Sequence, residues 1–147
     1  MNLTNVRRQL HSLPNKAMAE DLDEILGWME DNPEPPRWLY EYPKAVTRLS
    51  YWIGELQTNV RNHESELNRI KGELDIQVRQ ELVDAEDKIT EDKVRRQIYA
   101  NAAYRSQFSI IAACKGILTF IRGLRSAWND NLLVQMSVNW RHQAEVQ

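Results

Sequence analysis

The chain has 147 residues, 42% hydrophobic and 27% charged, which predicts one globular unit of the all-α class and excludes fibrous and disordered proteins. Its N-terminal segment MNLTNVRRQLHSLP is too polar for a signal peptide, and no segment holds eighteen uncharged apolar residues, so secretion and membrane insertion are not expected. A cytoplasmic location is expected instead. The single cysteine, Cys114, can form no internal disulfide.

The formal net charge of −2 conceals a marked asymmetry between the two parts of the chain. Residues 1–92 hold 19 acidic and 11 basic side chains, whereas residues 93–147 hold 2 acidic and 8 basic ones. Between Lys93 and Asn129 there is no Asp or Glu. This stretch predicts either a surface for anions or nucleic acid, or a surface that the acidic residues of the same or another chain neutralise.

Residues 1–36 are predicted to form a short helical arm followed by a Pro-rich linker. Asn15 is the expected N-cap of a helix over about 16–31, because apolar side chains recur on one helical face. These side chains are Met18, Leu22, Ile25, Leu26 and Met29. Three prolines in DNPEPPRW end this helix and favour an extended linker. The arm is expected either to be mobile or to cap the rest of the chain.

Residues 37–147 are predicted to form a long helical hairpin that carries DNA binding and oligomerisation. Its first helix is expected from near Pro43 to about residue 84, with apolar side chains in heptad order, as in a coiled coil. The seam consists of Val46, Leu49, Ile53, Leu56, Val60, Leu67, Ile70 and Leu74, with His63 at the one remaining position. A seam histidine is expected to fix the register or to find a hydrogen-bond partner.

The acidic segment ELVDAEDKITEDK is the expected turn, with Thr90 as the N-cap of the next helix. That helix is predicted to run without a break to Met136, and its apolar arc is wider than one partner helix needs. The N-terminal helix, another subunit, or both are expected to cover the excess. The predicted oligomerisation residues are Ile111, Cys114, Leu118, Ile121, Leu124, Trp128, Leu132 and Met136. Three cations in SIIAACKGILTFIRGLRSAW argue against a membrane span.

Catalytic motifs are missing from the sequence. The five glycines are scattered singly, so no loop can cradle phosphates, and three distant histidines with one cysteine give neither a zinc site nor a nucleophile with its base. We therefore expect no enzyme, no metal and no cofactor. Arg95, Arg96 and Arg105 interleave with Tyr99 and Tyr104, which is typical either of nucleic-acid contact or of ordinary packing.

Three segments together carry a resemblance to a known family. They are WLYEYPKAVTRLSYW at the head of the long helix, the acidic turn followed by a Thr-capped helix, and CKGILTFIRGLRSAW. Over about residues 38–140 the chain resembles the UvsY-like recombination mediator proteins of T-even-type bacteriophages. The resemblance implies an all-helical protomer that forms a ring through its C-terminal helix, with a heptamer as one option. It further implies binding of single-stranded DNA and help to a RecA-like recombinase in displacing single-strand-binding protein, during phage recombination and repair in the host cytoplasm.

The family carries a basic cluster in the middle of its long helix, where this chain has only Arg69, Lys71 and Arg79 among several acids. Basic residues of the following helix are the alternative carriers of DNA contact. The full set of expected DNA-binding residues is Arg69, Lys71, Arg79, Lys93, Arg95, Arg96 and Arg105. Residues 1–36 have no counterpart in the resemblance. The competing hypothesis is a structural coiled-coil protein, such as a virion scaffold or assembly chaperone, that does not bind DNA.

Overall fold

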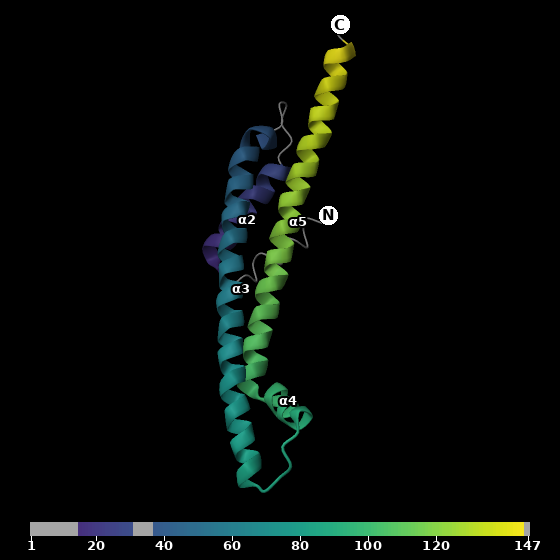
Figure 1. Ribbon diagram of the computed structural model, residues 1–147. Coiled ribbons are helices and arrows are strands. Elements are labelled where there is room, and N and C mark those ends of the chain that lie inside the picture. The colour runs from purple at the N-terminus through teal and green to yellow at the C-terminus, as the bar shows by residue number, and fades with distance from the viewer. Residues whose placement is uncertain (1–14, 31–36, 146–147) are drawn as a thin grey trace. The chain divides into compact units, whose positions relative to one another are not determined.

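A computed structural model describes residues 15–30 and 37–145, with side chains described over 15–28 and 41–130. The described residues form four helices and no strand, which confirms the all-α class (Figure 1). The helices are α2 (Lys16–Glu30), α3 (Arg37–Asp84), α4 (Glu91–Ala100) and α5 (Ala102–Glu145). The predicted prolines of the linker and the side chains of Met29, Leu132 and Met136 lie outside the described residues.

The chain divides into two compact units. Unit 1 contains Met1–Gly54 and Phe120–Gln147, and unit 2 contains Glu55–Thr119. Helices α3 and α5 therefore contribute one part to each unit, and α2 shares unit 1 with the beginning of α3. The boundary predicted at residue 36 does not coincide with this division.

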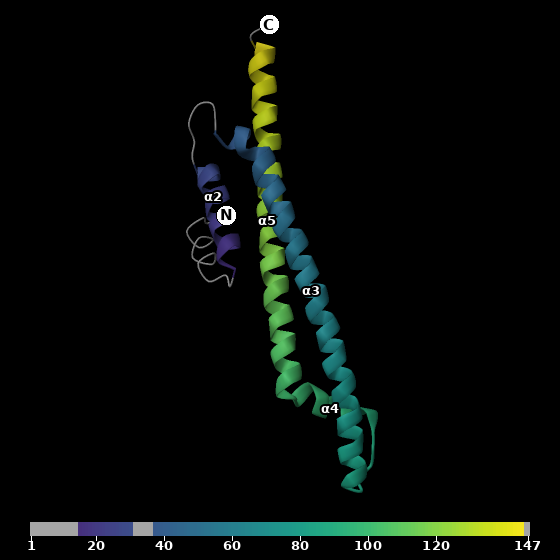
Figure 2. The ribbon, with the colours of Figure 1, turned by 90° about the vertical axis from the view of Figure 1, so that its left-hand side faces the viewer.

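Unit 1 is held by a fully buried apolar face on α2. Leu22, Ile25 and Leu26 have no exposed surface, as the helical spacing of these residues predicts. Asp21 on the same helix accepts a hydrogen bond from Nε1 of Trp52 at 3.0 Å and pairs with Arg48 at 3.2 Å. Figures 1 and 2 show α2 next to the N-terminal part of α3. Helix α2 is thus part of a packed core.

Helix α3 begins at Arg37, so the prediction of a start near Pro43 was wrong and this proline lies inside the helix. A proline there removes one backbone hydrogen bond and strains the preceding turn. Tyr42, the residue before this proline, contacts α5 within unit 1. The Tyr42 hydroxyl donates to Oδ1 of Asn129 at 2.6 Å, and the Tyr42 ring lies 6.3 Å from the Trp128 ring.

The turn after α3 closes as a Schellman motif. The amide of Asp87 donates to the carbonyl of Leu82 at 2.9 Å, and that of Glu86 to the carbonyl of Val83 at 3.0 Å. Glu86 takes the left-handed conformation, with φ of 52°. Thr90 then caps α4, since its side chain accepts from the amide of Lys93 at 3.3 Å, which confirms the predicted cap.

The prediction of one unbroken helix from the turn to Met136 was wrong, because α4 ends at Ala100 and α5 begins at Ala102. Asn101 causes the break. Its backbone is extended, its amide donates to the carbonyl of Ile98, and its Oδ1 accepts from the amide of Ala103 at 2.9 Å. One residue therefore terminates the first helix and caps the second.

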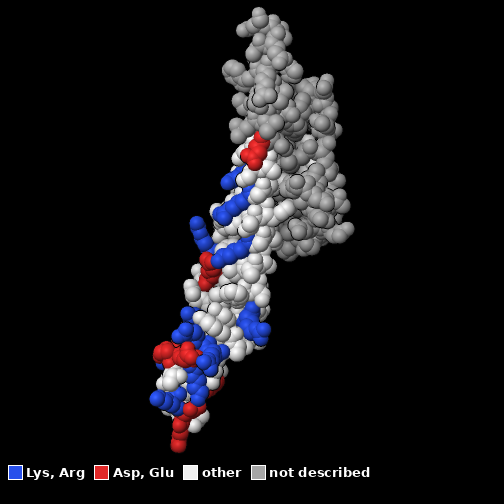
Figure 3. Space-filling model, turned by 90° about the vertical axis from the view of Figure 1, so that its right-hand side faces the viewer, with Lys and Arg blue, Asp and Glu red and all other residues white. Residues whose placement is uncertain are grey.

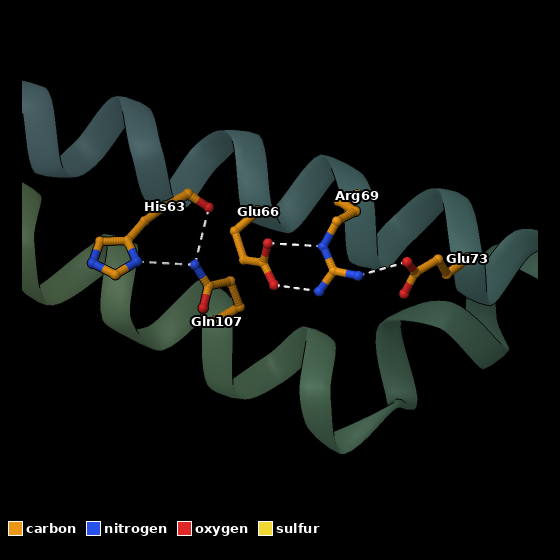
Figure 4. A network of polar contacts seen from close by, with 5 residues as sticks. All are labelled: His63, Glu66, Arg69, Glu73 and Gln107. Atoms are coloured by element: carbon orange, nitrogen blue, oxygen red, sulfur yellow. Dashed lines mark hydrogen bonds and ion pairs between the residues drawn. The ribbon is translucent and has the colours of Figure 1, made fainter.

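The predicted heptad seam is buried at Leu49, Ile53, Leu56 and Val60. Beyond them His63 is half-buried, and Nε2 of Gln107 on α5 lies 3.0 Å from its Nδ1 and 3.0 Å from its backbone oxygen (Figure 4). The expectation that the histidine finds a hydrogen-bond partner is confirmed. Farther along, Val78, Leu82, Val94 and Ile98 form the core between α3 and α4, with Leu74 and Tyr104 packed against them.

The segment Ala102–Asp130 is long and apolar enough to span a membrane. Core helices of soluble proteins meet the same two criteria. Within it Ile111, Leu118, Ile121, Leu124 and Trp128 are buried in the chain itself.

Candidate nucleic-acid interface

Five of the seven basic residues predicted to bind DNA are held in ion pairs with carboxylates of this chain. Arg69 is the clearest case. Its guanidinium lies between Glu66 and Glu73 on the same face of α3, with Nε 2.9 Å from Oε2 of Glu66 (Figure 4). The hydrogen bonds with Glu66 and Glu73 raise the pKa of Arg69, and the bond with Arg69 lowers the pKa of Glu66. Arg69 is therefore already neutralised.

Arg79 joins two segments through its guanidinium. Its Nε lies 2.9 Å from Asp75, one turn earlier on α3, and its Nη2 lies 2.9 Å from both carboxylate oxygens of Glu91 in the first turn of α4. The pKa of Arg79 is raised by hydrogen bonds first with Asp75 and then with Glu91. Its observed contacts give Arg79 a structural role, since they fix the start of α4 against α3.

The basic residues of α4 face the acids of the turn and of their own helix. Lys93 pairs with Asp87, and this contact lowers the pKa of the Asp87 carboxyl. Asp92 lies 3.0 Å from Arg96 and 3.8 Å from Arg95. Figure 3 shows acidic side chains directly against basic ones at the lower end of the face in view. The charge of α4 is thus partly compensated.

Two of the predicted residues, Lys71 and Arg105, have no ion-pair partner among the residues that the structure describes. The same holds in that part of the chain for Arg122 and Arg125. Lys115, by contrast, lies 2.7 Å from Glu64 on α3. Within the described residues, Lys71, Arg105, Arg122 and Arg125 therefore have no carboxylate partner and are available to an external anion.

Three aromatic rings follow one another around the break at Asn101, and we name them the aromatic ladder: Tyr99, Tyr104 and Phe108. The ring centroids of Tyr99 and Tyr104 lie 5.2 Å apart, those of Tyr104 and Phe108 lie 6.4 Å apart, and both pairs are stacked. Tyr99 is 47% exposed and Phe108 56% exposed. Because the chain bends at Asn101, Tyr99 on α4 can lie beside Tyr104 in the first turn of α5.

Two hollows lie along this ladder and share Tyr99. The larger, of about 430 Å³, is lined by Tyr99, Tyr104, Arg105, Phe108 and Ser109. The smaller, of about 160 Å³, is lined by Lys71, Asp75, Glu91, Val94, Arg95, Ile98 and Tyr99. Both carboxylates of the smaller hollow are bound by Arg79. The structure therefore brings Lys71, Arg95 and Arg105 around one set of stacked rings, all within unit 2.

Sequence reasoning noted Tyr99 and Tyr104 but missed Phe108. The signal was present, because Phe108 follows Tyr104 by four residues and so lies on the same helical face. The bend at Asn101, which places Tyr99 beside Tyr104, was not indicated by any such spacing in the sequence.

The predicted oligomerisation residues lie largely inside the chain. Ile111, Leu118, Ile121, Leu124 and Trp128 are at most 7% exposed, whereas Cys114 is half-buried. Other apolar side chains of this segment retain surface, among them Phe108, Ile110, Cys114 and Ile117. An interface between copies that uses the five buried residues would require the packed helices of the protomer to separate.

A scan against protein-family models, a search of curated proteins and a search of solved structures each give no match to this chain. In the part of the chain that the structure describes, no three His, Cys, Asp or Glu side chains lie together as metal ligands would.

Proposed function

We propose that the chain is a non-enzymatic recombination mediator that binds single-stranded DNA as a ring-forming homo-oligomer. In this role it helps a RecA-like recombinase to load onto DNA covered by single-strand-binding protein. The resemblance stated above supplies the biological role. The residues supply the reason to expect polyanion binding.

One observation carries the proposal. The stretch from Lys93 to Asn129 contains seven cations and no acid, and three of these cations, Arg105, Arg122 and Arg125, have no ion-pair partner in the described part of the chain. Arginines without an acidic partner on an acid-free stretch of helix attract phosphate because binding releases the counterions condensed on DNA. The cations that are held in ion pairs contribute to phosphate binding only where a phosphate displaces their carboxylate partner.

Loading a filament requires no bond to be made or broken by the mediator. It is a competition of affinities for one strand, so weak contacts that are repeated around a ring are sufficient. Linking copies raises the effective concentration of each further contact, and this multiplies modest phosphate binding into avidity. The absence of catalytic motifs in the sequence is consistent with such a role.

The surface of α5 that remains outside the protomer core supports self-association. Ile110, Cys114 and Ile117 follow four- and three-residue steps on one helical face, and all three retain exposure. These three side chains are therefore accessible to a neighbouring copy.

Fluorescence anisotropy with a labelled single strand tests the proposed function. The purified chain should bind at micromolar concentration or below in about 50 mM salt, and log Kd should rise with log salt by about 0.7 for each phosphate neutralised. Replacing both Arg122 and Arg125 by Ala should reduce that slope. Exchange of Arg61, another exposed cation, for Ala is the matched control within α3. No binding at low salt would contradict the proposal.

The alternative function is a structural coiled-coil oligomerisation protein that does not bind DNA. The ion pairs of Arg69, Arg79, Lys93, Arg95 and Arg96 favour it, because they assign those cations to the fold. A chain that assembles normally but ignores oligonucleotides would support this alternative.

A further inference from the structure

We propose that the aromatic ladder is a stacking platform for the bases of a single strand, with Arg105 and Lys71 on the neighbouring phosphates. This inference rests on the proposed function, and it adds a binding mode that reads unpaired bases rather than charge alone. A duplex would not satisfy it, because paired bases offer no free face.

The two outer rings of the aromatic ladder are exposed. Tyr104 is half-buried and packs against the core of Val78, Leu82, Val94 and Ile98, so its ring has a structural role. Tyr99 and Phe108 do not belong to that core, and about half of each side chain faces outward. Large apolar rings are rarely left so exposed together in a monomer without a binding role.

The three rings of the aromatic ladder are only slightly inclined to one another. The rings of Tyr104 and Phe108 are inclined by only 16°, and those of Tyr99 and Tyr104 by 28°. The ladder therefore presents nearly parallel planes, fixed at their centre by the buried side of Tyr104. Every base has a π-face, so such planes bind single strands with little sequence preference.

Basic side chains line both hollows beside the aromatic ladder. Arg105 lies between Tyr104 and Phe108 in sequence and lines the larger hollow, while Lys71 lines the smaller one, and neither has an acidic partner in the described residues. The two carboxylates near Lys71 are neutralised by Arg79. A base in the hollow of about 430 Å³ would thus have cations on both sides of Tyr99 for its phosphates.

The test compares a labelled oligo(dT) strand with an abasic strand of the same length, which has the phosphates but no bases. The full-length chain should bind oligo(dT) more tightly. Tyr99→Ala and Phe108→Ala should each weaken oligo(dT) binding by about tenfold and leave the abasic strand unaffected. Tyr99→Phe, which keeps the ring, should retain the affinity. Arg105→Ala should weaken binding of both strands alike.

Tyr51→Ala is the matched control, because Tyr51 is a similarly exposed tyrosine, 57% exposed, in unit 1. Circular dichroism checks that every variant remains helical. Equal binding of both strands, unchanged by Tyr99→Ala and Phe108→Ala, would overturn the ladder and leave the proposed function standing. Failure to bind either strand would overturn both. A changed oligomeric mass with an unchanged preference for oligo(dT) would make the ladder a contact between copies and overturn its assignment to bases.

Discussion

Units 1 and 2 use the same kind of helix in opposite ways. In unit 1 the side chains of Leu22, Ile25, Leu26, Leu49, Ile121, Leu124 and Trp128 are at most 1% exposed. In unit 2 the core between α3 and α4 has four buried members, while Ile76, Val83, Ile89, Tyr99, Phe108 and Ile110 are exposed. Among the described residues, the large apolar side chains that remain exposed thus lie in unit 2, except for Tyr51 in unit 1.

The largest predicted effect tests this separation with one substitution in two places. Ile25→Ala in unit 1 should lower the free energy of unfolding by about 2–5 kcal/mol, because it leaves a cavity in a fully buried site. Ile76→Ala in unit 2, where the side chain is 73% exposed, should change it by less than about 0.5 kcal/mol. Urea denaturation followed by circular dichroism measures both, and equal losses would contradict the comparison.

A second prediction concerns the polar link within unit 1. Asp21→Ala removes the acceptor of the Trp52 hydrogen bond and one of the two carboxylate partners of Arg48, the other being Glu24, and should cost about 1–2 kcal/mol. Asp21→Asn keeps an acceptor oxygen and loses only the charge, so its cost should be smaller. The two variants are compared by thermal unfolding. If they proved equally destabilising, the hydrogen bond from Trp52 would contribute nothing measurable.

A third prediction is that substitution by glycine changes the stability of the chain in opposite directions at two positions of unit 2. Glu86 holds a left-handed conformation that L side chains adopt at a cost, so Glu86→Gly should stabilise the chain by about 1 kcal/mol. Glu81→Gly, inside α3, should destabilise it by about the same amount. Urea midpoints distinguish the two. A loss of stability in Glu86→Gly would show that the turn relies on another contact of that side chain.

The smallest effect is a dependence on pH at the start of α4. The pKa of Asp87 is lowered mainly by its hydrogen bond with Lys93, so the folded state favours the carboxylate. Its contribution to stability is complete above the ordinary value of 3.8 and is lost as pH falls below that value through the lowered pKa. Asp87→Asn should remove this part of the acid dependence, measured as the urea midpoint against pH. An unchanged acid limb would contradict the assignment.

Local patterns predicted much of the fold. The spacing of apolar residues located the buried face of α2 and the seam as far as Val60, and the Thr90 cap followed from its place before Glu91 and Asp92. The break at Asn101 was not predictable in this way, because asparagine is tolerated inside helices and its capping depends on the fold around it. Pro43 led to a different error, because it lies inside α3 at a place where the sequence pattern predicted the start of the helix.

Only some of the ion pairs of the candidate site could be predicted from the sequence. The neutralisation of Arg96 by Asp92 and of Arg79 by Asp75 follows from four-residue spacing and could have been foreseen. The pairs Arg79 with Glu91 and Lys93 with Asp87 depend on how the turn folds back, which sequence spacing does not reveal. Charge counting therefore identified the acid-free stretch correctly and overestimated how much of its charge is free.

Size-exclusion chromatography with multi-angle light scattering, run with and without an oligo(dT) strand, shows both whether copies associate and whether they bind DNA. We expect a species of several 17.3 kDa protomers that gains the mass of bound DNA when the strand is present. A single 17.3 kDa protomer that elutes unchanged beside free oligonucleotide would contradict it.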